Sequence, residues 1–302
     1  MTVEWGDQER RLTDRVSVLV GDARGGYPHG NSVLVRGASE TFLIDPSVTV
    51  ASKGGAPAKV DALLHSHAHE DHMCGNRLFS GARVHIHDAD LVGIQSLDGL
   101  MGIYGFPDAG LADAFRKIVV DEFHFEPRPD ARGFGDGERF DLGGLTIEAV
   151  HLPGHTRGHS GFRIEGDVFF LADIDLTGFG PYYGDAWSDL DQFEESLRCV
   201  RDEEAAYYVT FHQKGVIEGR ADFLERLDGF ANVIERRHGA MLEFLAEPRS
   251  IEEMVAHRFV YRPTAETPIA DPVKRRTAEM HLARMLERGE AREVEPARYQ
   301  AA

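Results

Sequence analysis

The chain has little cysteine, since only Cys74 and Cys199 occur in 302 residues. Two cysteines in different sequence contexts give no disulfide framework, which excludes a small, disulfide-stapled fold. No apolar run approaches the ~18 residues that a membrane-spanning helix needs, and the polar N-terminus has no signal-peptide core. These absences predict a cytoplasmic protein that does not bind a membrane.

Basic residues are also scarce, because 33 Lys and Arg stand against 51 Asp and Glu, for a formal net charge of −18. The acidic excess falls in residues 1–219, whereas the rest of the chain is nearly balanced. Such a field repels polyanions and disfavours nucleic acid as a partner. With 42% hydrophobic residues, the chain is long enough for one large domain and a small one.

The most informative stretch that is present is residues 60–76, VDALLHSHAHEDHMCGN. An apolar, strand-like segment runs directly into the spacing His67-x-His69-x-Asp71-His72. Neutral imidazole and carboxylate are ligands that suit zinc, and a catalytic site needs about three protein ligands per ion. The stretch therefore supplies part of the ligands of two metal ions and requires more of them downstream.

Three later segments present a suitable side chain. His155 lies in the glycine-flanked turn LPGHTRGHS, Asp173 ends the β-rich run FFLAD, and His212 ends YVTFH. Ligands at strand ends are held by the scaffold rather than by a mobile loop. A histidine-rich surface loop would not explain why separate strand-like segments end in His or Asp.

This order and spacing resemble the metallo-β-lactamase-fold superfamily over roughly residues 16–220. The resemblance implies two divalent metal ions, in the first place zinc, although manganese and iron accept the same ligands. It assigns His67, His69 and His155 to the first ion, Asp71, His72 and His212 to the second, and Asp173 to both. Asp45, which ends TFLID, matches the superfamily's first motif and would hydrogen-bond a metal ligand. The remaining histidines that we assign to structure are His65, His85, His87, His124, His151 and His159.

The fold that the resemblance implies is α/β, a four-layer αβ/βα sandwich over residues 1–220 with the metals at one edge between the sheets. Short β-branched runs are consistent with it. They lie at 16–20, 32–36, 41–45, 60–64 and 83–86, and again at 145–150, 161–164 and 168–172. Residues 88–139 are apolar but loosened by glycine, which predicts either a lid-like insertion over the site or ordinary helices on one face of the sheet.

Residues 221–302 differ in kind. We expect a long amphipathic helix at 223–245, a short one opened by the capping box at Ser250, and a third that starts at Asp271 and stops at Gly289, before a strand-like end. Three helices and a strand resemble the winged-helix domain of the lactamase-beta-like 2 branch, whose members are described as ribonucleases. Basic residues in this tail could contact phosphates, while interleaved glutamates favour a solvated surface or a homodimer contact. These basic residues include Arg236, Arg237, Arg249, Arg258, Arg262, Lys274, Arg275 and Arg276.

Some residues near the predicted ligands are candidate substrate contacts. In the family, the loop equivalent to 25–31 borders the active site, so Tyr27 and His29 could touch substrate or form a solvated turn. Tyr182 and Tyr183 follow the bridging carboxylate in a glycine-rich loop. A phenol there could hydrogen-bond a developing oxyanion, and packing is the alternative. A helix N-capped by Ser188 would follow.

Two ions that share a carboxylate would bridge a water and lower its pKa towards ~7, which makes hydroxide available to attack a carbonyl. Asp71 would orient that hydroxide. The prediction is a hydrolase of a small thioester, ester or lactone with an apolar part. The alternatives are a metal-dependent endoribonuclease, favoured by the tail, and a mononuclear iron persulfide dioxygenase, which uses a subset of the same ligands.

The sequence departs from the family pattern in two places. Asp173 follows Ala172, and His212 follows Phe211, where many relatives have glycine. The chain after His212 also shows no basic glutathione-binding pattern, which weakens a glyoxalase II assignment.

Overall fold

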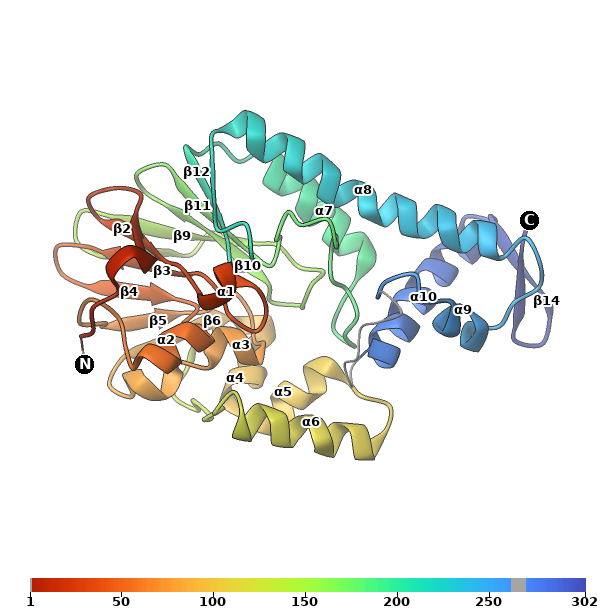
Figure 1. Ribbon diagram of the computed structural model, residues 1–302, viewed down its shortest axis with the longest axis horizontal. Coiled ribbons are helices and arrows are strands. Elements are labelled where there is room, and N and C mark those ends of the chain that lie inside the picture. Colours follow the sequence, from red (N-terminus) through yellow and green to blue (C-terminus); the bar gives the residue numbers. More distant parts are fainter. Residues whose placement is uncertain (1, 262–269) are drawn as a thin grey trace.

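The computed structural model describes residues 2–261 and 270–302 of the chain (Figure 1). Its strands form two large sheets, in which each strand pairs with its neighbour in sequence. The first sheet contains β1 (Glu9–Arg11), β2 (Val16–Leu19), β3 (Ser32–Arg36), β4 (Thr41–Ile44), β5 (Ala62–Leu64), β6 (Arg83–His87) and β7 (Arg132–Phe134). Strands β1 to β4 are antiparallel, and β4 to β7 are parallel.

The second sheet contains β8 (Arg139–Asp141), β9 (Thr146–His151), β10 (Ser160–Ile164), β11 (Val168–Ala172), β12 (Tyr207–Thr210) and β13 (Val216–Glu218). All of its pairs are antiparallel except β11 with β12. Because side chains alternate along a strand, Val33 and Val35 of β3 face the second sheet, while Leu34 faces the helices outside. The core between the sheets is therefore aliphatic and aromatic.

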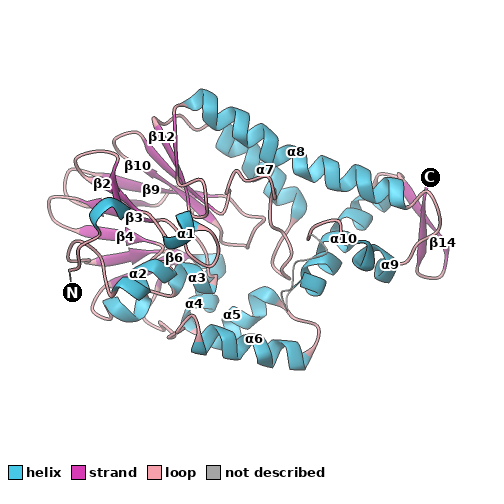
Figure 2. Cartoon of the chain, in the orientation of Figure 1, coloured by secondary structure: helices cyan, strands magenta, loops and turns pink. Residues whose placement is uncertain are grey.

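Helices cover the outer face of each sheet (Figure 2). The first sheet is covered by α2 (Val48–Lys53), α4 (Leu91–Gln95), α5 (Leu97–Tyr104) and α6 (Ala109–Asp121), and the second by α7 (Leu190–Arg201) and α8 (Arg220–Phe244). Two short helices, α1 (Asp22–Gly25) and α3 (Glu70–Met73), lie in loops, as do the 3-10 turns Gly6–Gln8, Asn76–Phe79 and Asp88–Asp90. This arrangement confirms the predicted four-layer αβ/βα sandwich.

The segment at 88–139 fits neither prediction alone. Its helices α4 to α6 pack on the first sheet as ordinary core elements, yet Tyr104 and Phe115 also line a cavity beside the predicted ligands. Residues 132–134 are strand β7 of the first sheet, so the predicted insertion extends too far. A strand of three residues is too short to show the alternation of apolar and polar residues by which strands are recognised in a sequence.

The tail consists of the second half of α8, then α9 (Ile251–His257), α10 (Ala270–Glu287) and a hairpin of β14 (Ala291–Glu295) and β15 (Arg298–Ala301). The capping box at Ser250 is confirmed. Helix α8 contributes Phe223 and Leu227 to the core under the second sheet and Met241 to the core of the tail, and Figure 1 shows it running between the two. The winged-helix assignment and the boundary at 220 stay predictions, and Arg262 lies outside the described residues.

Helix α7 begins one residue later than predicted. Its N-cap is Asp189, whose side chain accepts a hydrogen bond from the backbone of Gln192. The predicted cap, Ser188, instead donates its hydroxyl to the carbonyl oxygen of His155 at 2.7 Å. No helix within residues 2–261 and 270–302 is both long and apolar enough to cross a membrane.

Candidate metal centre

The predicted ligands lie just past the ends of neighbouring strands. Asp45 follows β4, His67 and His69 follow β5, and α3 then carries Asp71 and His72. In the second sheet the corresponding residues are His155 after β9, Asp173 after β11 and His212 after β12. The strand ends bring these side chains to one edge between the sheets, where all of them except Asp45 form two groups.

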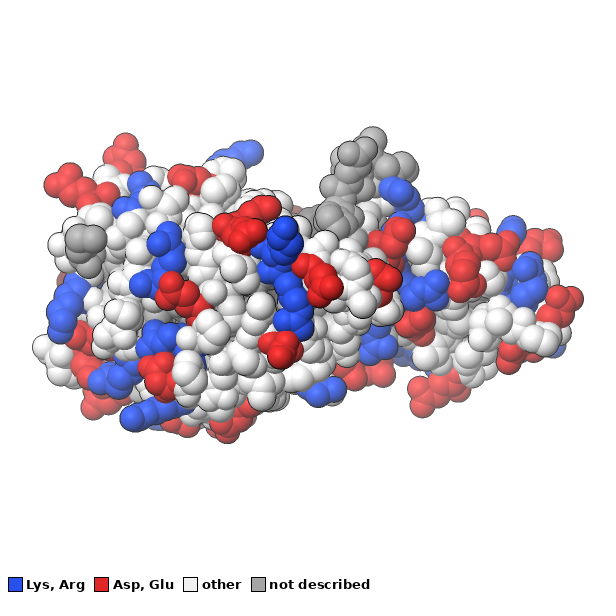
Figure 3. All heavy atoms as spheres, turned by 90° about the horizontal axis from the view of Figure 1, so that it is seen from below, with Lys and Arg blue, Asp and Glu red and all other residues white. Residues whose placement is uncertain are grey.

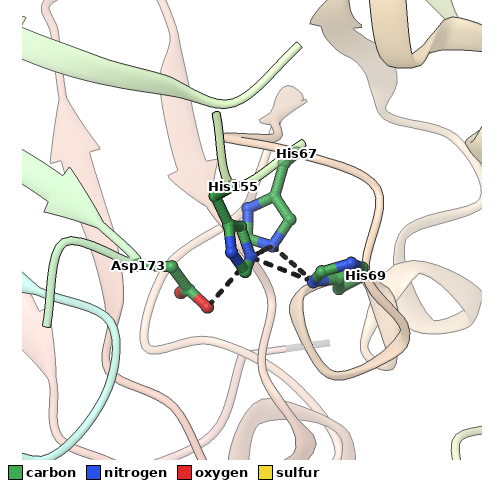
Figure 4. A group of neighbouring side chains, drawn as sticks. All are labelled: His67, His69, His155 and Asp173. Atoms are coloured by element: carbon green, nitrogen blue, oxygen red, sulfur yellow. Dashed lines mark hydrogen bonds and ion pairs between the residues drawn. The ribbon is translucent and has the colours of Figure 1, made fainter. Parts of the chain in front are cut away.

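The first group consists of three imidazoles and a carboxylate (Figure 4). His67 Nε2 lies 3.0 Å from His69 Nδ1, and His155 Nε2 lies 3.2 Å and 3.1 Å from these two nitrogens. Asp173 Oδ2 lies 3.4 Å from His155 Nε2. Four ligand atoms from three loops therefore converge on one point.

The outer nitrogens of these rings fix their tautomers. His155 Nδ1 donates to the carbonyl oxygen of Tyr182 at 2.9 Å, and His69 Nε2 faces Asp185 Oδ2 at 3.1 Å. His67 Nδ1 lies 3.0 Å from the hydroxyl of Ser66, which itself donates to Asp45. Each inward nitrogen is then left with a lone pair, and three lone pairs at this separation repel one another unless a cation lies between them. The donor set fits a metal ion.

The second group consists of Asp71, His72 and His212. His72 Nδ1 pairs with Asp45 Oδ2 at 2.9 Å, and His212 Nδ1 lies 3.2 Å from the carbonyl oxygen of His29, so both rings also turn a free lone pair inwards. His212 Nε2 lies 3.2 Å from Asp71 Oδ2, and His72 Nε2 lies 3.1 Å from Asp173 Oδ1.

Several inward atoms at the second group are buried without a hydrogen-bond partner: His72 Nε2 and Asp71 Oδ2 of the group itself, and Oδ1 of Asp173, which belongs to the first group. Orphaned buried polar atoms are costly unless an ion coordinates them. Asp173 turns Oδ1 to His72 and Oδ2 to His155, so its two oxygens face different groups. This is the geometry expected of a bridging carboxylate.

The two groups differ in their affinity for protons. Burial lowers the pKa of His155 to about 4 and holds the pKa of His67 well below its usual value. Burial also opposes a charged His212, but the carboxylates of Asp173 and Asp175 outweigh it and raise its pKa to about 10. The pKa of His72 is raised well above its usual value for the same reason, with Asp173 as the largest favourable charge.

The two departures from the family pattern have structural consequences. Ala172 adopts a left-handed backbone with φ of 50°, where the pairing of β11 with β12 shifts register, and this turn releases Asp173 from the strand. Phe211 stacks on His72 with ring centroids 3.6 Å apart. It fits only because Gly30 has no side chain, since a Cβ there would lie 2.0 Å from the Phe211 ring.

The predicted substrate contacts separate into different environments. Tyr182 lines the cavity and donates its hydroxyl to Asp185. Tyr183 is fully buried with its hydroxyl 3.0 Å from His281 Nε2, which is against a substrate contact for this residue. The ring of His29 pairs with Thr49, so the carbonyl oxygen of His29 rather than its imidazole contacts the site.

His159 was assigned to structure, and its hydrogen bonds agree with that. It accepts from the backbone of Asp173 and donates to Leu152, which leaves it no lone pair for a metal.

A cavity of about 370 Å³ opens beside the two groups. Six aromatic side chains line it: Tyr27, Tyr104, Phe115, Phe179, Tyr182 and Tyr261. Glu70 also lines the cavity and accepts hydrogen bonds from Tyr27 and Tyr104, while burial and Asp71 raise its pKa. Sequence analysis missed Glu70, Asp185 and Tyr104, and for Glu70 its place inside the ligand motif was an available signal.

The chain is similar to a known protein family and to several known proteins. A family model described as the metallo-beta-lactamase superfamily matches residues 25–212. An uncharacterized protein of Mycobacterium tuberculosis is 31% identical over 120 residues, which are 39% of this chain and 49% of that protein. An atrochrysone carboxyl ACP thioesterase of Pseudocercospora fijiensis is 33% identical over 103 residues, 33% of this chain and 30% of that protein.

A hydroxyacylglutathione hydrolase of Aeromonas salmonicida is 22% identical over 179 residues, 58% of each chain. The chain thus spans less than two thirds of the length of these relatives. Among solved structures, a metallo-beta-lactamase family protein of Thermus thermophilus superposes with a TM-score of 0.71 at 22% identity, covering 97% of this chain and 100% of the other. That likeness concerns the fold, and its coverage includes the C-terminal helices.

Proposed function

Because the chain belongs to the metallo-beta-lactamase superfamily, we propose that it is a dinuclear metal-dependent hydrolase of a carbonyl substrate: a thioester, ester or lactone with an apolar part. The observation that carries this proposal is the convergence of seven ligand residues in two groups that share Asp173. The names of two relatives, a thioesterase and a hydroxyacylglutathione hydrolase, support hydrolysis of an acyl bond.

In this proposal His67, His69 and His155 hold one ion, Asp71, His72 and His212 hold the other, and Asp173 contacts both. Zinc suits these ligands, and manganese or iron also accept them. When bound, such ions supply a hydroxide at neutral pH and polarise the oxygen of the substrate carbonyl.

The chain's own residues supply positioning and proton handling. Asp71 turns Oδ2 towards the second group as a ligand, and its carboxylate would also accept a hydrogen bond from the attacking oxygen and orient it. Tyr182 is held by Asp185 on the cavity wall, where its phenol is within the lining that the substrate would meet. Hydrolysis adds one water across the acyl bond and releases a carboxylate with a thiol or an alcohol.

Two features argue against the alternatives. The second group is as complete as the first, whereas a mononuclear iron dioxygenase needs only a subset of these ligands. On the face seen in Figure 3, acidic side chains are interspersed with basic ones rather than separated from a basic patch. Together with the net charge of −18, the mixed charge of this face disfavours a polyanionic RNA as a substrate.

The test is turnover of N-acetylcysteamine thioesters and of lactones by the purified, zinc-loaded protein. Asp173→Asn should lower kcat/KM at least about a hundredfold, because both groups lose the shared charge. His124→Asn, at an exposed histidine, is the matched control and should keep full activity. Cleavage of single-stranded RNA with no turnover of any carbonyl substrate would overturn the proposal, as would oxygen consumption on a persulfide.

A further inference from the structure

The cavity beside the ligand groups has two aromatic walls. Tyr104 and Phe115, from α5 and α6, form one wall with ring centroids 4.8 Å apart. Phe179 and Tyr261 form part of the other, with centroids 5.7 Å apart. Tyr27 stands near the mouth with 60% of its surface exposed. Aromatic faces carry negative electrostatic potential, so walls of this kind attract cations as well as apolar groups.

Glu70 places a carboxylate among these rings. The side chain is only 4% exposed, and it accepts hydrogen bonds from the hydroxyls of Tyr27, at 3.1 Å, and Tyr104. Donors to a carboxylate favour its ionised form. Burial and the charge of Asp71 raise the pKa of Glu70, and the hydrogen bond from Tyr104 opposes that rise. Glu70 therefore places a carboxyl group, held by two tyrosine hydroxyls, on the wall of the cavity and outside both ligand groups.

The charge around the proposed ions does not cancel that of Glu70. Four other carboxylates face the ligand imidazoles: those of Asp45, Asp71, Asp173 and Asp185. Together they match the formal charge of two divalent ions, so the proposed ions leave no positive charge to offset the Glu70 carboxyl group.

No described residue that lines the cavity is a lysine or an arginine. Arg237 lies behind the Phe179 wall, but its guanidinium donates to the carbonyl oxygens of Phe179 and Pro181 at 2.7 Å each. Within residues 2–261 and 270–302, the cavity therefore offers an anionic acyl end no lysine or arginine to pair with. A cationic group would meet both a carboxylate and aromatic faces.

We propose that Glu70 determines specificity, and that the cavity takes acyl groups whose far end is a protonated amine or a quaternary ammonium while rejecting those that end in an anion. The inference rests on the proposed function and adds the substrate class to it. Uncharged acyl groups of the same shape should be turned over with a kcat/KM between those of the cationic and the anionic groups.

Matched substrates test this directly. Phenylacetyl thioesters of N-acetylcysteamine that carry a para-aminomethyl, para-ethyl or para-carboxy group differ in charge at nearly constant size, and their leaving group is uncharged. For the zinc-loaded wild type at neutral pH, kcat/KM should fall in that order, with about tenfold or more between the cationic and anionic members. In Glu70→Gln the ratio of kcat/KM between the cationic and the anionic thioester should fall towards one. It should persist in Glu70→Asp and in the control Glu126→Gln, at an exposed position.

A binding measurement separates this inference from the proposed function. Benzyltrimethylammonium has no carbonyl and no metal-ligating atom, so its affinity, measured by calorimetry, reports on the cavity alone. It should bind the wild type and lose at least about tenfold in affinity in Glu70→Gln. If this ion binds but no thioester is turned over, the hydrolase proposal fails and the cation site stands. Equal or better turnover of the anionic thioester, or equal binding by wild type and Glu70→Gln, would overturn the inference.

Discussion

At the scale of single residues, the orientation of each imidazole decides what the centre can do. Backbone carbonyls and carboxylates fix the outer nitrogens of His72, His155 and His212, which turns the second nitrogen of each ring inwards as an acceptor. His159 lies in the same cluster, but both of its ring nitrogens form hydrogen bonds with the backbone of Leu152 and Asp173. Ligand and structural histidine are thus distinguished by their hydrogen bonds rather than by their distance from the site.

Acidification should release the metal of the second group first. Protons compete with metal for imidazole, and the ring with the higher pKa is protonated at the higher pH. The pKa of His212 is about 10 and that of His72 is raised well above its usual value. In the first group the pKa of His155 is about 4 and that of His67 lies well below its usual value, and only the pKa of His69 is raised, by its contact with Asp185. As pH falls, the second group therefore loses its ion while the first retains its own.

Metal content after dialysis at a series of pH values measures this order. The wild type should lose its metal in two steps, and His212→Ala should lack the step at higher pH. A single cooperative loss in the wild type would contradict the assigned order.

Gly30 is the residue whose substitution should disturb the centre without touching a ligand. In Gly30→Ala the new Cβ would lie 2.0 Å from the ring of Phe211, which stacks on His72. Overpacking of this kind costs about 1–3 kcal/mol, so the midpoint of urea unfolding of the metal-free protein should fall. Gly81→Ala, with nothing within 4 Å of its Cβ, is the control. Adding Phe211→Leu to Gly30→Ala should recover part of the loss, and no recovery would show that the clash lies elsewhere.

At the scale of elements, sequence analysis succeeded where function and structure share a local pattern. Asp173 directly follows β11, and His67 and His212 follow β5 and β12 within three residues, so the strand ends indicated where these side chains would meet. Their roles as ligands came from the family resemblance and stay a prediction. Ser188 was wrong as a helix cap because its hydroxyl is committed to a distant carbonyl, and Asp189 caps α7 instead. Tertiary hydrogen bonds of this kind leave no mark on the local sequence.

The cavity wall was less predictable because its members come from separate elements. Tyr104 reaches Glu70 across 34 residues of sequence. Tyr182 and Tyr183 are adjacent and chemically alike, yet the first lines the cavity and the second packs against His281 on α10. Only the packed structure decides which side each ring faces.

Helix α8 carries two glycines, Gly229 and Gly239, at interior positions where an added Cβ would meet nothing within 4 Å. Replacing glycine by alanine in such a position removes backbone entropy from the unfolded chain. Each substitution should raise the free energy of unfolding by about 0.5–1 kcal/mol, measured by urea denaturation. A destabilisation by either variant would indicate that α8 has a partner surface that an added methyl obstructs.

At the scale of the whole molecule, the C-terminal helices support the loop that borders the candidate metal centre. Tyr183 donates to His281, His281 lies 3.2 Å from His238, and His238 pairs with Glu290 at 2.8 Å. This buried chain of hydrogen bonds joins the loop after β11 to α8, α10 and the residue before β14. The same loop carries the Tyr182 carbonyl that orients His155.

Arg237→Ala tests this brace. The variant leaves the carbonyls of Phe179 and Pro181 without their donor, which should cost about 1–3 kcal/mol of stability and lower kcat/KM several-fold as the Tyr182 wall loosens. Its neighbour Arg236 is exposed, so Arg236→Ala should change neither quantity. Equal behaviour of the two variants would mean that the tail is not coupled to the site.

In the proposed centre, two groups of ligands joined by Asp173 each hold one ion. The most direct measurement is the metal content per chain, by elemental analysis of protein purified and then loaded with zinc. We predict about two zinc ions in the wild type and about one in His212→Ala, with the first group still filled. One ion per chain in the wild type, unchanged by His212→Ala, would contradict a dinuclear centre.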